Sequence, residues 1–164
     1  MKTLIRILGA LVLLFALFMT WYWFTHRMRP AVEFKIGSDD APQSLLIAYQ
    51  GSNYKNNLTA KLCTHYSTSD VVIKGIDVDK LPEIDPDEWT AILILHTWEV
   101  WRAPEVVAAF HLRTIGANNI VYFTTSGDGS YHFEDVDAVT SASLIEDLEK
   151  DAQNAIIHLE AIID

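Results

Sequence analysis

The sequence contains only one cysteine, Cys63, among its 164 residues. A single thiol cannot form an internal disulfide, so a folded domain in this chain depends on its hydrophobic core. Cys63 falls within apolar residues at helical spacing, where a cysteine is most often simply buried. The histidines lack the spacing of metal ligands; they are His26, His65, His96, His111, His132 and His158. We therefore expect no metal site.

Basic residues are scarce after residue 30. That part of the chain holds 8 of the 12 lysines and arginines but all 22 aspartates and glutamates, which gives a net charge of −14. Such a surface repels phosphate backbones, so nucleic acid is not an expected partner, and flat binding to anionic lipid is disfavoured. The sequence also shows no nucleophile with a paired base, which argues against a hydrolase.

The first 30 residues contain no acidic side chain and carry an apolar run from Ile7 to Phe24. A run of this length can span the hydrocarbon core of a membrane as one helix. A cleaved signal peptide is the alternative, but its apolar core covers only about 7–15 residues before a small-residue cleavage site. No Ala-x-Ala follows this run, which ends in the aromatic residues 21–24, a composition typical of the membrane interface. We expect residues 1–30 to be an uncleaved anchor, and membrane lipid to be its partner.

The orientation of this anchor depends on the lysines and arginines that flank it. Lys2 and Arg6 precede the apolar run, and Arg27 and Arg29 follow it, so the bias that normally sets orientation is nearly balanced. A short charged N-terminal tail usually stays in the cytoplasm. We therefore expect a single-pass protein of the cell (inner) membrane with its domain on the extracytoplasmic side.

Residues 31–43 contain Gly37, Asp39, Asp40 and Pro42, which indicates a linker. Residues 44–164 then alternate apolar runs with helical patterns. The expected strands cover residues 44–49, 71–76, 90–96, 119–124 and 136–139. Helices are expected over 56–66 with Asn56 or Asn57 as cap, from Pro104 onward, and from Ser143, where Glu146 completes a capping box. The alternation predicts an α/β domain with a parallel five-stranded sheet covered on both faces.

In sheets of this kind, ligands bind beyond the carboxyl ends of the strands, where the strand order reverses. The loops after Tyr49, His96 and Thr124 should therefore build the site. The first loop has the composition of an anion site at a helix N-terminus. Its candidate residues are Gly51, Ser52, Asn53, Lys55 and Asn56. An ordinary strand-to-helix turn explains the same residues equally well.

The second loop places two tryptophans at the end of the most apolar strand. Trp98 and Trp101, next to Thr97, can stack on a flat heterocycle or pack on neighbouring loops, and their position favours a ligand role. The third loop has small polar residues that let backbone amides approach a ligand, although this motif is unspecific by itself. Its candidate residues are Ser126, Gly127 and Asp128.

The order of these elements over residues 44–164 resembles the flavodoxin-like family. WTAILILHTWEVWRAPEVVAAF is similar to the third strand, aromatic loop and following helix of that family, and IVYFTTSGDGS to its fourth strand and Ser-Gly loop. The resemblance implies a three-layer flavodoxin-like sandwich that binds FMN, with the first loop on the phosphate and the other two beside the ring. The sequence departs from the family at Gly51 and Asn56, where hydroxyl side chains are usual, while the small residue Ala60 matches.

A second, local resemblance concerns the sequence DAVTSAS at residues 137–143. It is similar to the motif of FMN-binding domains that carry flavin covalently outside the cytoplasm, and it implies attachment of the FMN phosphate to Ser143. Ser141 replaces the usual glycine of that motif. An ordinary helix N-cap is the alternative role of Ser143.

Two functions are compatible with these features. The first is a membrane-anchored flavodoxin-like protein that binds FMN and exchanges electrons with a redox protein partner. The second is a flavodoxin-fold module without flavin that serves as a binding or scaffold protein at the membrane, which the altered phosphate loop favours.

Overall fold

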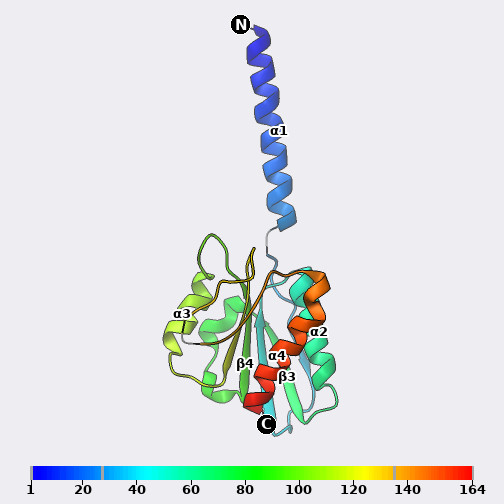
Figure 1. Cartoon of the computed structure of the whole chain (residues 1–164), viewed down its shortest axis with the longest axis vertical. Helices are drawn as coiled ribbons and strands as arrows, with labels where there is room; N and C mark the ends of the chain where they lie inside the picture. The colour runs from blue at the N-terminus through cyan, green and yellow to red at the C-terminus, as the bar shows by residue number, and fades with distance from the viewer. Residues whose placement is uncertain (1, 27, 135, 164) are drawn as a thin grey trace.

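The computed structural model describes residues 2–26, 28–134 and 136–163. Its first element, helix α1 (Lys2–His26), stands apart from an α/β domain (Figure 1). An 18-residue window within Lys2–Phe24 has a mean hydropathy of 2.3, and none of this stretch is buried against the rest of the chain. By length and composition this helix is able to cross a membrane, and it is not a core helix of the domain.

A six-stranded sheet forms the centre of the domain, in the order β1-β3-β2-β4-β5-β6. The strands are β1 (Phe34–Ile36), β2 (Gln43–Tyr49), β3 (Val71–Asp77), β4 (Ala91–Thr97), β5 (Ile120–Thr125) and β6 (Asp137–Ser141). Strands β2 to β6 are parallel, whereas β1 pairs antiparallel with β3. Counted along the chain, the parallel strands follow the order 2-1-3-4-5, which is that of the flavodoxin-like fold. The predicted fold class is confirmed.

The sheet has one strand more than the five that the sequence indicated. The additional strand β1 lies within residues 31–43, for which a linker was expected. Phe34 of this strand lies opposite Gly75 of β3, where an added Cβ would approach the Phe34 ring to 2.0 Å. The pairing therefore depends on a glycine about forty residues away, which no local pattern reveals.

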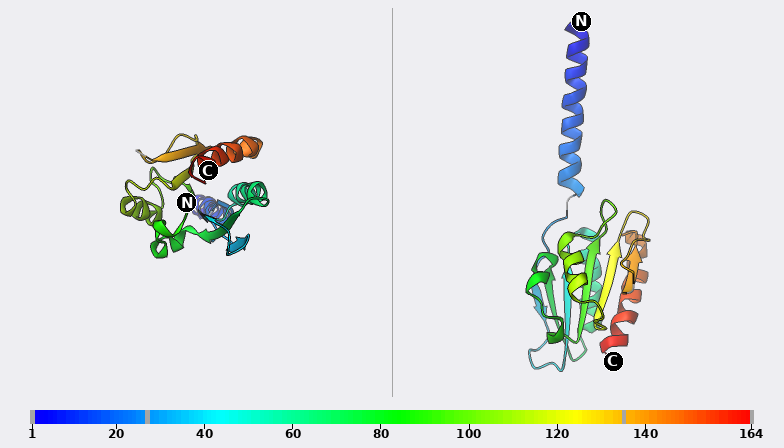
Figure 2. Two further views of the ribbon diagram at one scale, coloured as in Figure 1. Left: turned by 90° about the horizontal axis from the view of Figure 1, so that it is seen from below. Right: turned by 90° about the vertical axis from the view of Figure 1, so that its left-hand side faces the viewer.

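Helices cover both faces of the sheet (Figure 2). One face carries α2 (Asn53–Tyr66) and α4 (Leu148–Ile163), and the other carries α3 (Glu105–Arg113) and the short 3-10 helix η1 (Val78–Glu83). Strand β2 contributes to both cores, because Leu45 and Ile47 pack with the first pair of helices while Leu46 and Ala48 face the second. Burial on both faces explains why the strands are continuous apolar runs.

Helix α2 begins three residues earlier than the sequence indicated. Ser52 is its N-cap, and the Ser52 hydroxyl accepts a hydrogen bond from the backbone N–H of Lys55 at 3.2 Å. The expected caps, Asn56 and Asn57, lie inside the helix and are exposed. Consequently Lys55 belongs to the first helical turn instead of a loop.

Helix α4 begins at Leu148, after the short 3-10 helix η3 (Ile145–Asp147). The predicted capping box of Ser143 and Glu146 is therefore wrong. Strand β6 continues to Ser141, whose hydroxyl accepts a hydrogen bond from the backbone N–H of Ser143 at 3.0 Å. This bond holds Ser143 in a turn with a φ of 60°, which is not the extended conformation of an N-cap.

Candidate functional site

The carboxyl ends of β2, β4 and β5 lie at one edge of the sheet. The strand order reverses there, because β3 lies on one side of β2 and β4 lies on the other. Two cavities lie at this edge. The polar cavity, of about 820 Å³, is lined by residues 28–30, Val32, residues 51–56, Thr97, Thr125, Ser126, Ser143 and Ile145. The aromatic cavity, of about 730 Å³, is lined by Gln50, residues 97–105, Ala108 and Phe133. Both volumes lie in the range of small-molecule sites, and the cavities share Thr97.

The structure brings most of the candidate residues to these two cavities. Those that line the polar cavity are Gly51, Ser52, Asn53, Lys55, Asn56, Thr97, Ser126 and Ser143. Trp98 and Trp101 line the aromatic cavity. Gly127 and Asp128 are exposed and line neither cavity.

Gly51 is held against the segment that follows helix α1. Its backbone N–H donates to the Arg29 carbonyl at 2.8 Å, and the Arg29 N–H donates to the Gly51 carbonyl at 2.9 Å. A Cβ at residue 51 would lie 2.7 Å from the carbonyl oxygens of both Arg29 and Pro30. Glycine is thus required here for a close approach of two backbones, and its N–H is already engaged.

Lys55 is a buried charge of the polar cavity. Its side chain is only 1% exposed, and its Nζ lies 2.5 Å from Thr97 Oγ1 and 3.8 Å from Met28 Sδ. Among the described residues it forms no ion pair. Burial lowers the pKa of this ammonium group from 10.5 to about 8, and the charge of Glu99 opposes this decrease. The cavity therefore contains a buried cation that forms no ion pair with a described residue.

Threonine hydroxyls continue from Lys55 across the floor of the site. Thr97 Oγ1 lies 3.0 Å from Thr125 Oγ1, and the Thr125 hydroxyl donates to the His96 carbonyl at 3.2 Å. The Thr97 backbone N–H donates to the Gln50 side chain at 2.7 Å, which ties β4 to the first loop. These contacts fix the position of Thr97 between the two cavities.

The first turn of α2 offers backbone donors to the polar cavity. Within the described residues, the N–H groups of Asn53 and Tyr54 have no hydrogen-bond partner in the chain. Such groups at a helix N-terminus, together with the helix dipole, favour an anion. The N–H of Lys55 differs, because it already donates to the Ser52 hydroxyl.

Trp98 packs on the connection between β5 and β6. Its ring stacks on Tyr131 with centroids 6.1 Å apart and an interplanar angle of 11°, and it meets Phe133 edge-on at 5.2 Å. Its indole Nε1 is buried without a hydrogen-bond partner among the described residues. Trp101 instead projects from the loop with 79% of its surface exposed. Of the two tryptophans, Trp98 is thus a wall of the aromatic cavity and Trp101 lies at its rim.

The third loop satisfies its own polar groups. The Ser126 hydroxyl donates to Asp128 Oδ1 at 3.0 Å and accepts from the Gly129 N–H at 2.9 Å, while the Ser130 N–H also donates to Asp128. Hydrogen bonds, chiefly from Ser130, lower the pKa of the Asp128 carboxyl. This loop is therefore a self-contained turn that contributes only Ser126 to the polar cavity.

Two buried polar groups near the site were missed by the sequence analysis. The Asp151 carboxylate of α4 accepts from the Tyr54 hydroxyl at 2.5 Å and from the Ser141 hydroxyl at 2.6 Å, which joins α2, β6 and α4. Burial and this carboxylate raise the pKa of Tyr54. Fully buried His96 has a pKa of about 3 because of burial, so it is neutral at pH 7. Neither group has a local motif, because their partners lie far along the chain.

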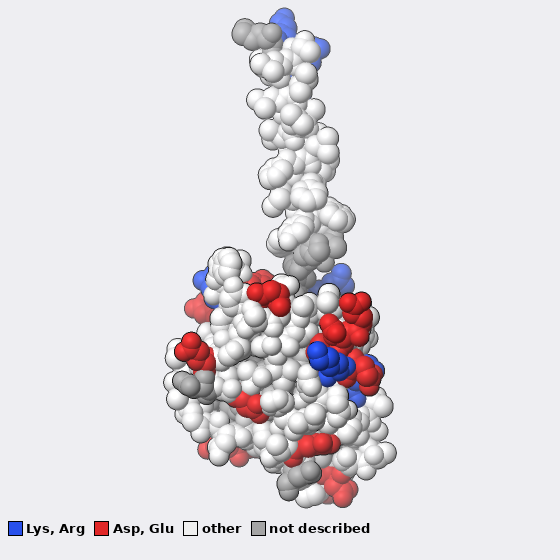
Figure 3. Space-filling view, viewed as in Figure 1, with Lys and Arg blue, Asp and Glu red and all other residues white. Residues whose placement is uncertain are grey.

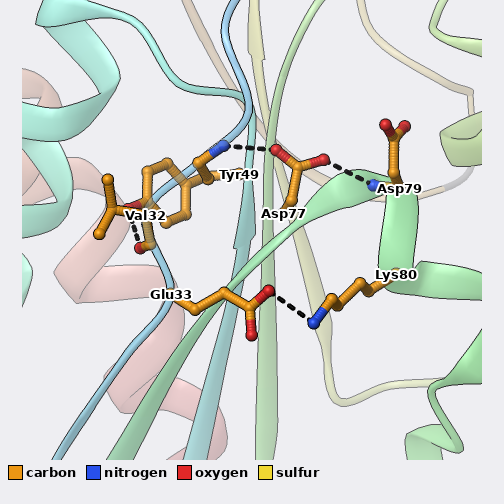
Figure 4. A network of polar contacts seen from close by, with 7 residues as sticks. Val32, Glu33, Tyr49, Asp77, Asp79 and Lys80 are labelled. Atoms are coloured by element: carbon orange, nitrogen blue, oxygen red, sulfur yellow. Dashed lines mark hydrogen bonds and ion pairs between the residues drawn. The ribbon is translucent and has the colours of Figure 1, made fainter.

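The segment after α1 is attached to this edge by several contacts (Figure 4). The Ala31 N–H donates to Asp77 Oδ2 at 2.5 Å, and the Tyr49 hydroxyl donates to the Val32 carbonyl at 2.7 Å. A surface ion pair joins Glu33 to Lys80. Residues 28–33 are thus part of the domain, and residues 28–30 form one wall of the polar cavity. The sequence indicated no such role for them.

Comparison with known proteins finds no matching family model and no matching curated protein. Among solved structures, oxidised flavodoxin 2 from Bacillus cereus is similar with a TM-score of 0.47 and 17% identity, over 72% of this chain and 99% of that one. A flavodoxin from Streptococcus pneumonia TIGR4 is similar with a TM-score of 0.39 and 16% identity, over 73% of this chain and 98% of that one. The fold assignment of the present chain follows from its own strand order.

Proposed function

We propose that this protein is a membrane-anchored flavodoxin-like protein that binds FMN without a covalent bond and takes part in electron transfer with a redox protein partner. The observation that carries the proposal is Lys55, a buried cation at the N-terminus of α2 that forms no ion pair with a described residue. A buried charge is costly unless an opposite charge accompanies it. A phosphate in the polar cavity supplies that charge.

The phosphate of FMN fits the donors that surround Lys55. The residues Asn53 and Tyr54 line the same cavity, and their backbone N–H groups have no partner in the described chain. The positive end of the α2 dipole adds to their attraction for an anion. The side chains of Ser52 and Thr97 line the same cavity.

The ring of the flavin would occupy the adjoining aromatic cavity. Thr97 lies on both cavities, so a ligand with one anionic end and one flat aromatic end can reach both. Trp98 and Phe133 offer apolar walls there. Bound FMN supplies the redox chemistry, while these residues orient the ring and exclude water from it.

The membrane part of the proposal rests on helix α1. An apolar helix that is exposed from Lys2 to Phe24 is not stable in water, and a bilayer buries it. We place the domain on the extracytoplasmic side. The mass of the protein from the membrane fraction tests this anchor, since an intact chain that begins at Met1 is expected. A soluble protein that begins after residue 24 would mean that the helix is a cleaved signal peptide.

A flavin-free binding module is the second candidate function. The observation in its favour is that several donors of the first loop are already engaged within the chain. The Gly51 N–H donates to the Arg29 carbonyl, the Lys55 N–H donates to the Ser52 hydroxyl, and the Arg29 and Pro30 carbonyls lie against this loop. This arrangement leaves fewer donors for a phosphate than the sequence pattern implied.

A paired titration with FMN and riboflavin separates these functions. The full-length protein in mild detergent should bind FMN at least tenfold more tightly than riboflavin, because only FMN carries the phosphate that faces Lys55. Lys55→Met should remove most of this preference, while Lys61→Met should keep it. Lys61 is a suitable control because it lies on the same helix but pairs at the surface with Glu149. Failure to bind either flavin would favour the binding module.

Acid precipitation tests the covalent alternative at Ser143. If FMN binds as proposed, acid should release all of the yellow colour, and Ser143→Ala should leave the colour unchanged. Colour that stays with the precipitated wild-type protein and disappears in this variant would establish attachment to Ser143.

A further inference from the structure

The loop between β4 and α3 ends in a tight hairpin with an apolar tip. Glu99 and Arg102 exchange two backbone hydrogen bonds, at 2.9 and 3.1 Å, around the residues Val100 and Trp101. These two residues have φ values of 49° and 66°. Positive φ at both central positions is the type I′ geometry, which normally selects Asn-Gly. A β-branched residue and an indole in this conformation are strained.

The strained residues of this tip are also the most exposed apolar side chains of the domain. Val100 is 83% exposed and Trp101 is 79% exposed. Strained residues of this kind cluster at functional sites. Here it presents two large apolar side chains to the outside, at a site where Asn-Gly would make the same turn without strain.

A second apolar tip with the same character lies between β6 and α4. Ser143 has a φ of 60°, and the exposed side chains of Leu144 and Ile145 follow it. Within the described part of the chain, the non-glycine residues with positive φ are Val100, Trp101 and Ser143. All of them lie at the carboxyl edge of the sheet, in loops that line the two cavities.

This edge is held close to the end of helix α1. Arg29 pairs with Gly51 only three residues after His26, the last residue of α1, and three residues of extended chain span about 10 Å. The contacts of residues 31–33 with the sheet prevent this segment from acting as a long flexible tether (Figure 4). The two perpendicular views show the β4–α3 loop rising beside the end of α1 (Figures 1 and 2).

We propose that the two tips, Val100–Trp101 and Leu144–Ile145, insert into the boundary between headgroups and acyl chains of the bilayer that holds α1. The inference rests on the membrane anchoring in the proposed function. Tryptophan and aliphatic side chains are favoured at that depth. Because α1 already holds the edge at the membrane, the tips act at a high effective concentration and modest affinity is sufficient. The domain therefore docks with its two cavities against the membrane surface.

The charges of the domain determine which lipid this docking needs. The acidic surface disfavours attraction to anionic headgroups, so the contact is apolar. Figure 3 shows an uncharged projection over the β4–α3 loop, with charged side chains below it. Docking should consequently occur on zwitterionic phosphatidylcholine and should depend little on salt.

A nitroxide label on the full-length chain in phosphatidylcholine nanodiscs tests the docking. The label is attached to a cysteine at position 100 in a Cys63→Ala background, and its access to oxygen and to a water-soluble nickel chelate is measured by electron paramagnetic resonance. Leu112→Cys is the matched control, because Leu112 is also exposed but lies near the end of α3 that is away from the membrane edge. Leu13→Cys reports on the anchor.

Docking predicts that the ratio of oxygen access to chelate access is several-fold higher for the label at position 100 than for the label at position 112. Adding Trp101→Ser should reduce this ratio at position 100. A label at 100 that is as open to the chelate as the label at 112, while the label at 13 is shielded, would overturn the docking alone. A label at 13 that is open to the chelate would instead overturn the anchor, and the docking with it. A change at 100 on adding FMN in detergent, without a change on transfer to lipid, would assign the tip to the flavin and also overturn the docking.

A second measurement covers the case in which the Cys63→Ala background does not fold. Wild-type protein and Trp101→Phe are compared in nanodiscs that contain brominated phosphatidylcholine, which quenches tryptophan within the bilayer. Docking predicts that the quenched part of the emission is smaller in the variant. If the amount of emission that bromine quenches is the same in the two proteins, Trp101 lies outside the bilayer, and the docking is overturned.

Discussion

Replacement of Lys55 by methionine is predicted to stabilise the ligand-free protein. Methionine has nearly the same length and volume as the lysine side chain, so it fills the same space between Met28 and Thr97 without the charge. Lysine at this position is unfavourable because its ammonium group is buried and has no ion-pair partner in the described chain.

The size of the effect follows from the pKa of Lys55. Its decrease from 10.5 to about 8 corresponds to about 3 kcal/mol for burial of the charged form at pH 7. The hydrogen bond from Nζ to Thr97 offsets about 1 kcal/mol of this cost in the wild type. In the variant, Thr97 keeps its contact with Thr125. We therefore expect Lys55→Met to be more stable by about 2 kcal/mol at pH 7.

The sign of the pH dependence distinguishes this cause from a change in packing. Between pH 8 and 10.5 the unfolded chain keeps the Lys55 proton that the folded chain has lost, so the stability of the wild type rises with pH relative to the variant. Most of the difference should disappear by pH 10. Cys63, with a pKa raised to about 11 by burial, titrates in both proteins and cancels in the comparison.

The assay is urea unfolding of both full-length proteins in mild detergent at pH 7 and pH 10, in a buffer without phosphate. The difference in unfolding free energy between Lys55→Met and the wild type should be smaller at pH 10 than at pH 7 by about 2 kcal/mol. The dependence of the unfolding free energy on urea concentration should not change. Lys61→Met, at the surface of the same helix, should show no such change. A constant difference between wild type and Lys55→Met at the two pH values would refute the claim that Lys55 is buried as a charge.

Three further changes test other parts of the account. Gly51→Ala should separate residues 29–30 from the first loop and destabilise the domain by about 1–3 kcal/mol. Proteolysis between α1 and β1 should then become faster, and an unchanged rate of digestion would contradict the close approach seen at Gly51. The double change Val100→Asn with Trp101→Gly should stabilise the domain by about 1–2 kcal/mol in urea unfolding, because it removes two strained residues; a loss of stability would mean that the tip is not strained. Asp151→Ala should lower the urea midpoint by the equivalent of about 1–3 kcal/mol, since two buried hydroxyls lose their acceptor; an unchanged midpoint would show that this cluster contributes nothing.

The sheet was predictable from the sequence because its signal is local. Strands buried on both faces must be apolar without interruption, as in the AILILH of β4, and the helices between them carry a different period. The carboxyl edge then follows from parallel strands alone. For this reason, ten of the twelve candidate residues line one of the two cavities at that edge.

The parts that the sequence did not reveal depend on contacts between distant residues. The fit of Gly51 against Arg29 joins the anchor segment to the first loop, and β1 forms because Gly75 admits Phe34. The burial of Lys55 follows from the start of α2 at Asn53, a boundary that the asparagine-rich sequence leaves ambiguous. The capping box at Ser143 was wrong because β6 extends to Ser141 and engages the chain beyond it.

The most direct test of the central claim is the titration of the full-length wild-type protein, purified in mild detergent, with FMN and with riboflavin, followed by visible absorbance. The account predicts a saturable spectral change with FMN at one equivalent and at least tenfold weaker binding of riboflavin, because the phosphate neutralises Lys55. No spectral change with FMN, or equal affinity for the two flavins, would contradict a flavin phosphate in the polar cavity.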